Sequence, residues 1–107
     1  MPYINLKTNI AVADANDLQK KLGEAIRLIP GKTPERTMIL IDDRQPLFFA
    51  GTAEPCIMVE TQVNAETDQS HIDRYCFGVI DLLAGELGVD EKRIYVNVNA
   101  PDNWYAK

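Results

Sequence analysis

The sequence contains little positive charge, few cysteines and no long apolar run. Its 107 residues include 11 Lys and Arg against 16 Asp and Glu, which gives a formal net charge of -5. Proteins that bind nucleic acid or an anionic membrane need clustered Lys and Arg, so we expect neither partner. No apolar run approaches the roughly 20 residues of a membrane span, and the N-terminus lacks signal-peptide features. We therefore expect a cytoplasmic protein that binds small molecules or proteins.

Cysteine and histidine are also scarce. Cys56 and Cys76 have neither metal-site spacing nor the CxxC spacing of redox motifs. Two cysteines are too few for a disulfide framework, so we expect buried free thiols. The single histidine, His71, is expected to be a solvated residue in the first turn of a helix. The sequence therefore predicts no metal site.

Length and composition, with 46% hydrophobic and 25% charged residues, favour one globular domain over residues 1–107. Period-two alternation predicts a strand at 3–8, and three- and four-residue apolar spacing predicts a helix at about 14–29, with Asp14 or Asn16 as N-cap. The same reasoning predicts these further elements: a strand at 37–41, a strand at 56–63, a helix at 72–87 with Asp68 as cap, and a strand after Arg93.

The predicted order is strand, helix, strand, repeated twice. Gly31-x-x-x-x-Arg36 before one strand is echoed by Gly88-x-x-x-x-Arg93 before another, although a shared way of ending helices would also produce this spacing. Two βαβ units with right-handed crossovers predict an α/β (α+β) fold, a four-stranded mixed sheet with both helices on one face. Because the 37–41 strand is apolar on both faces, we expect another subunit to cover the second face.

Several segments in order resemble the tautomerase superfamily, in the branch of macrophage migration inhibitory factor (MIF), also called phenylpyruvate tautomerase. These segments are MPYINLKTN, PGKTP, FFAGTAEPC, RIYVNV and a late Trp104. The resemblance covers nearly the whole chain and implies a homotrimer built from double βαβ units, which agrees with the uncovered face. It also implies a keto-enol tautomerase that needs no cofactor.

Pro2 is the candidate catalytic residue that this resemblance implies. After removal of the initiator methionine, Pro2 carries a free secondary amine. An α-amino group titrates at about 7.7–8.0, and an apolar pocket or a nearby cation lowers its pKa. A neutral amine can remove the proton next to a ketone and return it to the neighbouring position. The alternative is structural, because the first residue of a strand tolerates proline.

Three further residues match binding positions of the family. The resemblance implies that Lys32 holds the carboxylate of an α-keto acid, although a lysine just after a helix end also complements the helix dipole. Tyr95 and Asn97 match a tyrosine and an asparagine that a neighbouring subunit contributes. Strand alternation places both on one face, and each also has an ordinary explanation as a strand residue. Phe49, Ile39 and Trp104 are candidate apolar walls or core residues.

Two positions depart from the family pattern. Val63-Asn64-Ala65 replaces its usual serine, isoleucine and glycine, so Asn64 can still offer backbone groups while its side chain makes the pocket more polar. Arg36 replaces an aromatic residue and would either clamp a second carboxylate bidentately or pair with an acid on the surface. If Arg36 faces the pocket, a dicarboxylate or halogenated acid suits the site better than phenylpyruvate.

Three functions therefore remain open. The first is a tautomerase acting on α-keto acids such as phenylpyruvate, with Pro2 as base. The second is a cytokine-like protein-binding module, for which a blocked Pro2 amine leaves partner binding intact. The third is a hydratase or dehalogenase that uses Arg36, and activity that survives Arg36→Ala unchanged would exclude it.

Overall fold

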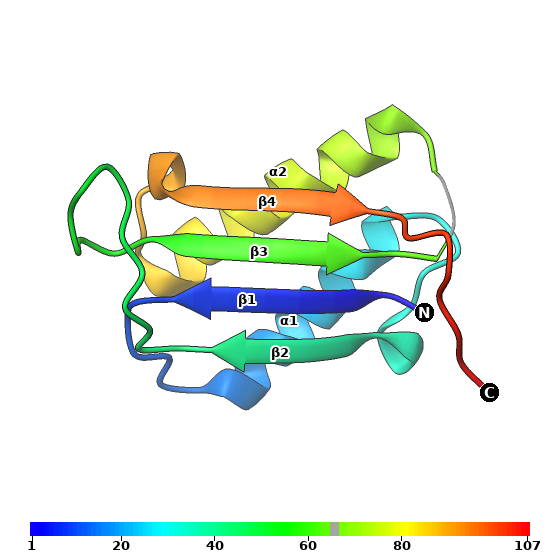
Figure 1. Ribbon diagram of the computed structural model, residues 1–107, viewed down its shortest axis with the longest axis horizontal. Coiled ribbons are helices and arrows are strands. Elements are labelled where there is room, and N and C mark those ends of the chain that lie inside the picture. The colour runs from blue at the N-terminus through cyan, green and yellow to red at the C-terminus, as the bar shows by residue number, and fades with distance from the viewer. Residues whose placement is uncertain (65–66) are drawn as a thin grey trace.

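The computed structural model describes residues 1–64 and 67–107, and they form two layers. One layer is a four-stranded sheet, and the other consists of helices α1 (Ala15–Ala25) and α2 (Gln69–Leu87), which lie side by side against one face of the sheet (Figure 1). Among the described residues, no helix is both long enough and apolar enough to span a bilayer.

The sheet has the order β2-β1-β3-β4. Strand β1 (Tyr3–Thr8) is parallel to β2 (Met38–Asp42) and antiparallel to β3 (Ile57–Gln62), which is in turn parallel to β4 (Ile94–Asn99). Each parallel pair is connected through one helix, so the chain contains two βαβ units that meet at the antiparallel β1–β3 pair. The fold predicted from the sequence, a mixed sheet with both helices on one face, is confirmed.

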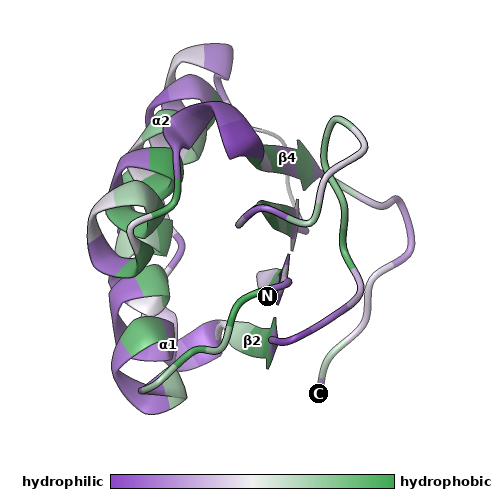
Figure 2. Ribbon diagram, turned by 90° about the vertical axis from the view of Figure 1, so that its left-hand side faces the viewer, coloured by the Kyte–Doolittle hydropathy of each residue, from purple (hydrophilic) through white to green (hydrophobic). Residues whose placement is uncertain are grey.

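The core lies between the helices and the sheet, where apolar faces of both layers meet. Figure 2 shows the hydrophobic sides of α1 and α2 turned toward the strands. Strand β1 contributes alternate residues to this core, because period-two alternation sends Ile4 and Leu6 to one face. The other large, fully buried members are Leu22, Ile26, Ile29, Val59, Val63, Tyr75, Val79 and Leu83.

The ends of the helices differ in part from the predictions. Asp14 caps α1, accepting a hydrogen bond from the Asp17 backbone N–H at 3.0 Å, but α1 ends at Ala25 and continues as a 3₁₀ turn over Ile26–Leu28. Helix α2 begins directly after Asp68, its predicted cap residue, and ends at Leu87 as predicted. Asp68 is its N-cap residue, yet the Asp68 side chain forms no capping hydrogen bond.

The face of the sheet opposite the helices carries apolar side chains at its β2 edge. Met38 and Leu40 are 72% and 43% exposed there, while Ile39 and Ile41 pack toward the core. The prediction that this strand is apolar on both faces is therefore confirmed. A second subunit that covers Met38 and Leu40 stays a prediction.

Candidate functional site

The strand directions bring four segments of the chain to one end of the sheet. Strands β1 and β2 begin at this end, while β3 and β4 run the opposite way and finish there. The pairing shows this, because Tyr3 at the start of β1 pairs with Met38 at the start of β2 and with Gln62 at the end of β3. Gln62 in turn pairs with Asn99 at the end of β4. The segments before β1 and β2 therefore meet those that follow β3 and β4. Pro2, Lys32, Arg36, Asn64 and Trp104 lie in these segments.

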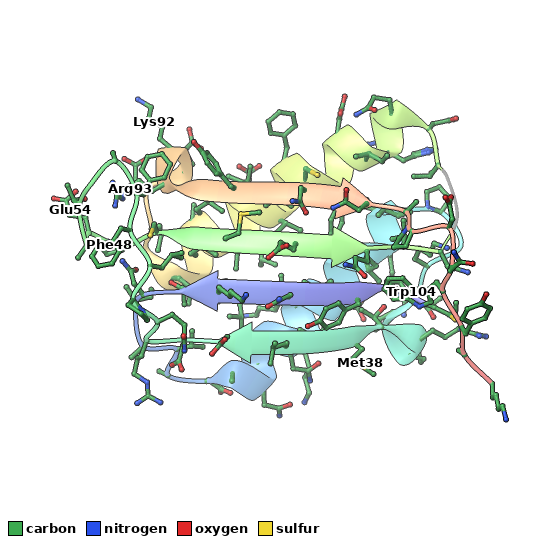
Figure 3. The ribbon with its side chains drawn as sticks, viewed as in Figure 1. Met38, Phe48, Glu54, Lys92, Arg93 and Trp104 are labelled. Atoms are coloured by element: carbon green, nitrogen blue, oxygen red, sulfur yellow. The ribbon has the colours of Figure 1, made fainter. Side chains whose placement is uncertain are left out.

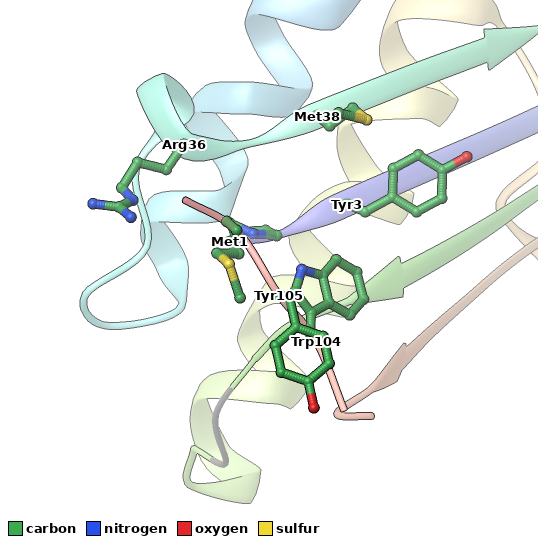
Figure 4. Close-up of a pocket in the computed structure, with 8 residues that line it drawn as sticks. Met1, Tyr3, Arg36, Met38, Trp104 and Tyr105 are labelled. Carbon is green, nitrogen blue, oxygen red and sulfur yellow. The ribbon is translucent and has the colours of Figure 1, made fainter. Parts of the chain in front are cut away.

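Two adjoining cavities share Met1, Pro2 and Arg36 as lining residues. The larger, of about 500 Å³, extends along the sheet under the C-terminal tail (Figure 4). The smaller, of about 230 Å³, extends toward the segment between α1 and β2 and toward Asn64. We call them the apolar cavity and the polar cavity.

Pro2 lies at the junction of these cavities because it directly precedes β1. The side chain of Pro2 is buried, and its carbonyl oxygen accepts a hydrogen bond from the Met38 backbone N–H at 3.0 Å. This bond extends the parallel β1–β2 pairing by one residue and holds Pro2 in place. The proline contributes no N–H to the ladder, so its position costs the sheet no hydrogen bond.

The polar cavity contains a small hydrogen-bonded group centred on the Asn64 side chain. Asn64 Oδ1 accepts from Lys32 Nζ at 2.9 Å and from the Met1 amino group at 3.3 Å. Gly31, with φ 80°, makes the turn after the 3₁₀ extension of α1 that brings Lys32 here. Burial, followed by the positive charges of Lys32 and Arg36, lowers the pKa of the Met1 amino group. An amine at this end of the chain is therefore biased toward its neutral form.

Arg36 ends a 3₁₀ turn over Pro34–Arg36 and lines both cavities. In Figure 4 its guanidinium extends away from the rings of Trp104 and Tyr105. The surface ion pair that the sequence left open for Arg36 is not found among the described residues, because the neighbouring acid Glu35 approaches Arg27 instead, at 3.7 Å.

The apolar cavity is lined mainly by aromatic and apolar side chains. Tyr3 and Met38 come from paired positions of β1 and β2, while Trp104 and Tyr105 come from the tail (Figure 4). Trp104 was predicted as an apolar wall, whereas the other three were not. Strand alternation could have indicated Tyr3 and Met38, since it places both on the face away from the helices.

Tyr95 and Asn97 lie elsewhere on the sheet. Both face away from the helices, as predicted, but Tyr95 pairs with Met58, whose partner on β1 is Lys7. Tyr95 is therefore near the end of the sheet opposite to Pro2, and Figure 3 likewise separates Arg93 from Trp104. Within one chain these residues do not reach the Pro2 cavities.

Phe49 and Ile39 do not line the cavities at Pro2. Phe49 packs edge-on against Tyr95, with ring centroids 5.3 Å apart, beside a cavity of about 190 Å³. Ile39 instead faces α1, close to Gly23 and Pro34. Within one chain, Phe49 packs against Tyr95 and Ile39 packs toward α1, while a role for Phe49 as an apolar wall stays a prediction.

Over residues 1–64 and 67–107, the cysteines and the histidine do not gather into a site. Cys56 is buried and Cys76 half-buried, and both are free thiols. His71 is half-buried rather than solvated as expected, and its Nδ1 forms no hydrogen bond with residues 1–64 or 67–107. Over the same residues, no three His, Cys, Asp or Glu side chains gather in a way that could hold a metal ion.

The double βαβ sheet with a buried proline at its N-terminal end defines a tautomerase-fold protein. A family model described as macrophage migration inhibitory factor (MIF) matches residues 1–105, and the chain belongs to this family. It is 32% identical to D-dopachrome decarboxylase of Gallus gallus over 110 residues, covering 97% of this chain and 90% of that protein.

Solved structures agree with this assignment. The MIF homologue of Prochlorococcus marinus superimposes with a TM-score of 0.80 at 29% identity, covering 91% of this chain and 86% of that one. Leishmania major MIF2 has a TM-score of 0.84 at 21% identity, with 97% and 93% covered, which supports the fold alone.

Proposed function

We propose that this protein is a cofactor-independent keto-enol tautomerase, an isomerase acting on α-keto acids such as phenylpyruvate, with Pro2 as the general base. The observation that carries the proposal is that Pro2 lines two cavities of complementary character. The similarity to a protein named D-dopachrome decarboxylase supports an enzyme rather than a module that only binds proteins.

The two cavities suit the two halves of such a substrate. In the polar cavity, the Lys32 ammonium attracts a carboxylate. The hydrogen bond that Lys32 donates to Asn64 Oδ1 orients this ammonium group. In the apolar cavity, Trp104, Tyr3 and Met38 provide a surface for a phenyl ring. A substrate that spans both places its ketone and the adjacent carbon beside Pro2.

The reaction needs one group that moves a proton. With Met1 removed, the neutral Pro2 nitrogen takes a proton from the carbon next to the ketone, and the electron pair of that C–H bond forms the carbon–carbon double bond of the enol. The carbonyl oxygen then takes up the proton. Lys32 and Arg36, which lower the pKa of the Met1 amine, favour the neutral form of an amine at this place.

The proposed active unit is a homotrimer. Tyr95 and Asn97 are exposed on the sheet face away from the helices, and Met38 and Leu40 leave apolar surface on the same face. In the proposed assembly this face meets neighbouring subunits, and Tyr95 and Asn97 of one subunit complete the pocket around Pro2 of the next. Sedimentation of the purified chain tests the assembly directly.

The decisive experiment measures phenylpyruvate enol-keto interconversion by ultraviolet absorbance, using protein whose free proline terminus is verified by mass. Pro2→Gly is expected to lower the rate about 10²-fold or more, because general base catalysis contributes at least that much. One extra residue before Pro2 turns its nitrogen into an amide and should have the same effect.

Pro46→Gly is the matched control, because Pro46 is exposed in the loop after β2, at the other end of the sheet. It should leave the rate unchanged, and all variants should sediment like the parent protein. A rate that survives both Pro2→Gly and the blocked terminus would exclude Pro2 as the base.

A further inference from the structure

Arg36 is an exposed arginine at the junction of the two cavities. It lines both cavities beside Pro2, and no ion pair or side-chain hydrogen bond joins its guanidinium to any residue of 1–64 or 67–107. Glu35, its neighbour in sequence, is directed to Arg27. Lys32, in contrast, already has a partner in Asn64 Oδ1. Arg36 is thus available to a ligand.

The charge around Pro2 favours an anionic ligand with more than one negative group. Lys32 and Arg36 are both close enough to lower the pKa of the terminal amine at Met1. None of the described residues that line either cavity is acidic. A monocarboxylate bound at Lys32 therefore leaves the positive charge of Arg36 without a counter-charge, whereas a dicarboxylate supplies one for each cation.

We propose that Arg36 binds a second carboxylate, so that the site selects α-keto acids with two carboxylates over monocarboxylates of equal length. The inference rests on the proposed function, since it assigns the first carboxylate to Lys32. The planar guanidinium matches a carboxylate bidentately, which a point charge cannot do. Because Arg36 borders both cavities, a substrate whose keto group lies at Pro2 can direct its far end to it.

The test compares two acids that differ only in the far group. 2-Oxoglutarate and 2-oxovalerate have the same chain length, and the terminal carboxylate of the first is a methyl group in the second. Proton NMR follows exchange of their C3 protons with solvent deuterium, which reports proton removal for both. We expect the parent protein to favour 2-oxoglutarate about tenfold in kcat/KM, the factor that about 1.4 kcal/mol supplies.

Arg36→Gln should abolish this preference, so that kcat/KM for 2-oxoglutarate and for 2-oxovalerate come within about twofold of each other. The loss of Arg36 also raises the pKa of the terminal amine, but that change affects both acids alike and leaves the ratio of their kcat/KM values unchanged. Arg44→Gln is the matched control. It removes the same charge after β2, at the end opposite to Pro2, and should leave the preference intact. Equal kcat/KM for both acids in the parent protein, or equal loss of preference in both variants, would overturn the proposal.

A binding measurement separates this inference from the proposed function. Glutarate and pentanoate form a matched pair without a ketone, and calorimetric titration measures their affinity whether or not the protein is a tautomerase. If glutarate binds more tightly than pentanoate, Arg36→Gln abolishes the difference, and neither keto acid exchanges, the proposed tautomerase activity is refuted while the second carboxylate site is supported. If both keto acids exchange at equal rates and glutarate and pentanoate bind equally well, the proposed tautomerase activity is supported while the second carboxylate site is refuted.

Discussion

The hydrogen bond between Tyr75 and Thr61 joins α2 to β3 inside the core, and it offers a quantitative test of the packing. The two hydroxyl oxygens are 2.8 Å apart, and both residues are 0% exposed. Burial raises the pKa of Tyr75 above its ordinary value, so the phenol stays neutral at any working pH. We consider the single variants Tyr75→Phe and Thr61→Val and the corresponding double variant.

Each single variant leaves one buried hydroxyl without the partner it has in this structure. The cost of such an unpaired group is about 1–3 kcal/mol. The double variant removes both hydroxyls, and replacing both partners by apolar groups of the same shape is nearly neutral. The cost of the double variant should therefore lie at least about 1 kcal/mol below the sum of the single costs, a coupling that contacting residues show.

Chemical and thermal unfolding measure these costs, at one fixed chain concentration because assembly stabilises the folded state. For a domain of this size, 1 kcal/mol shifts Tm by about 4–8 °C. Tyr105→Phe is the control, because Tyr105 lies exposed in the tail, and it should leave Tm unchanged. Single costs that simply add, within about 0.5 kcal/mol, would show that the two hydroxyls are not paired.

Two further predictions concern the site and the loop beside Tyr95. Burial and then Lys32 and Arg36 lower the pKa of the terminal amine, so Lys32→Gln should raise the pKa of the Pro2 amine once Met1 is removed. In the proposed tautomerase reaction, the pH at which kcat/KM is half-maximal should therefore move upward. A midpoint pH that does not move would contradict this prediction. Arg93 donates hydrogen bonds to the carbonyls of Phe49, Glu54 and Pro55, so Arg93→Ala should cost about 2–3 kcal/mol of unfolding free energy and speed proteolysis of the 49–55 loop. Arg93→Lys should recover less than half of that cost, since one ammonium group cannot span three carbonyls; full recovery would show that charge alone holds the loop.

Much of the fold could be predicted because it depends on local periodicity. Alternation identified β1 and placed Tyr95 and Asn97 on one face, and helical spacing identified α1 and α2. The ends of the elements were less accurate. The last turn of α1 tightens to 3₁₀ over Ile26–Leu28, although the apolar spacing continues to Ile29.

Other features depend on contacts between distant residues and had no local signal. Arg93 binds the Phe49 carbonyl 44 positions earlier in the chain, and this packing places the Phe49 ring against Tyr95 rather than beside Pro2. The interpretation of Arg36 needed the structure as well. Sequence spacing could not show that Glu35 turns toward Arg27 and leaves the Arg36 guanidinium at the cavities.

The sequence by itself determined the two strand-helix-strand units, because the periods of 2 and 3.6 residues are properties of neighbouring residues. Its resemblance to a known family pointed to Pro2, Lys32 and Asn64. Only the tertiary structure decided that these residues share a site with Trp104 and Arg36. The physical reason is strand direction: the antiparallel β1–β3 pair sets the start of one unit beside the end of the other, and the candidate site forms where those ends meet.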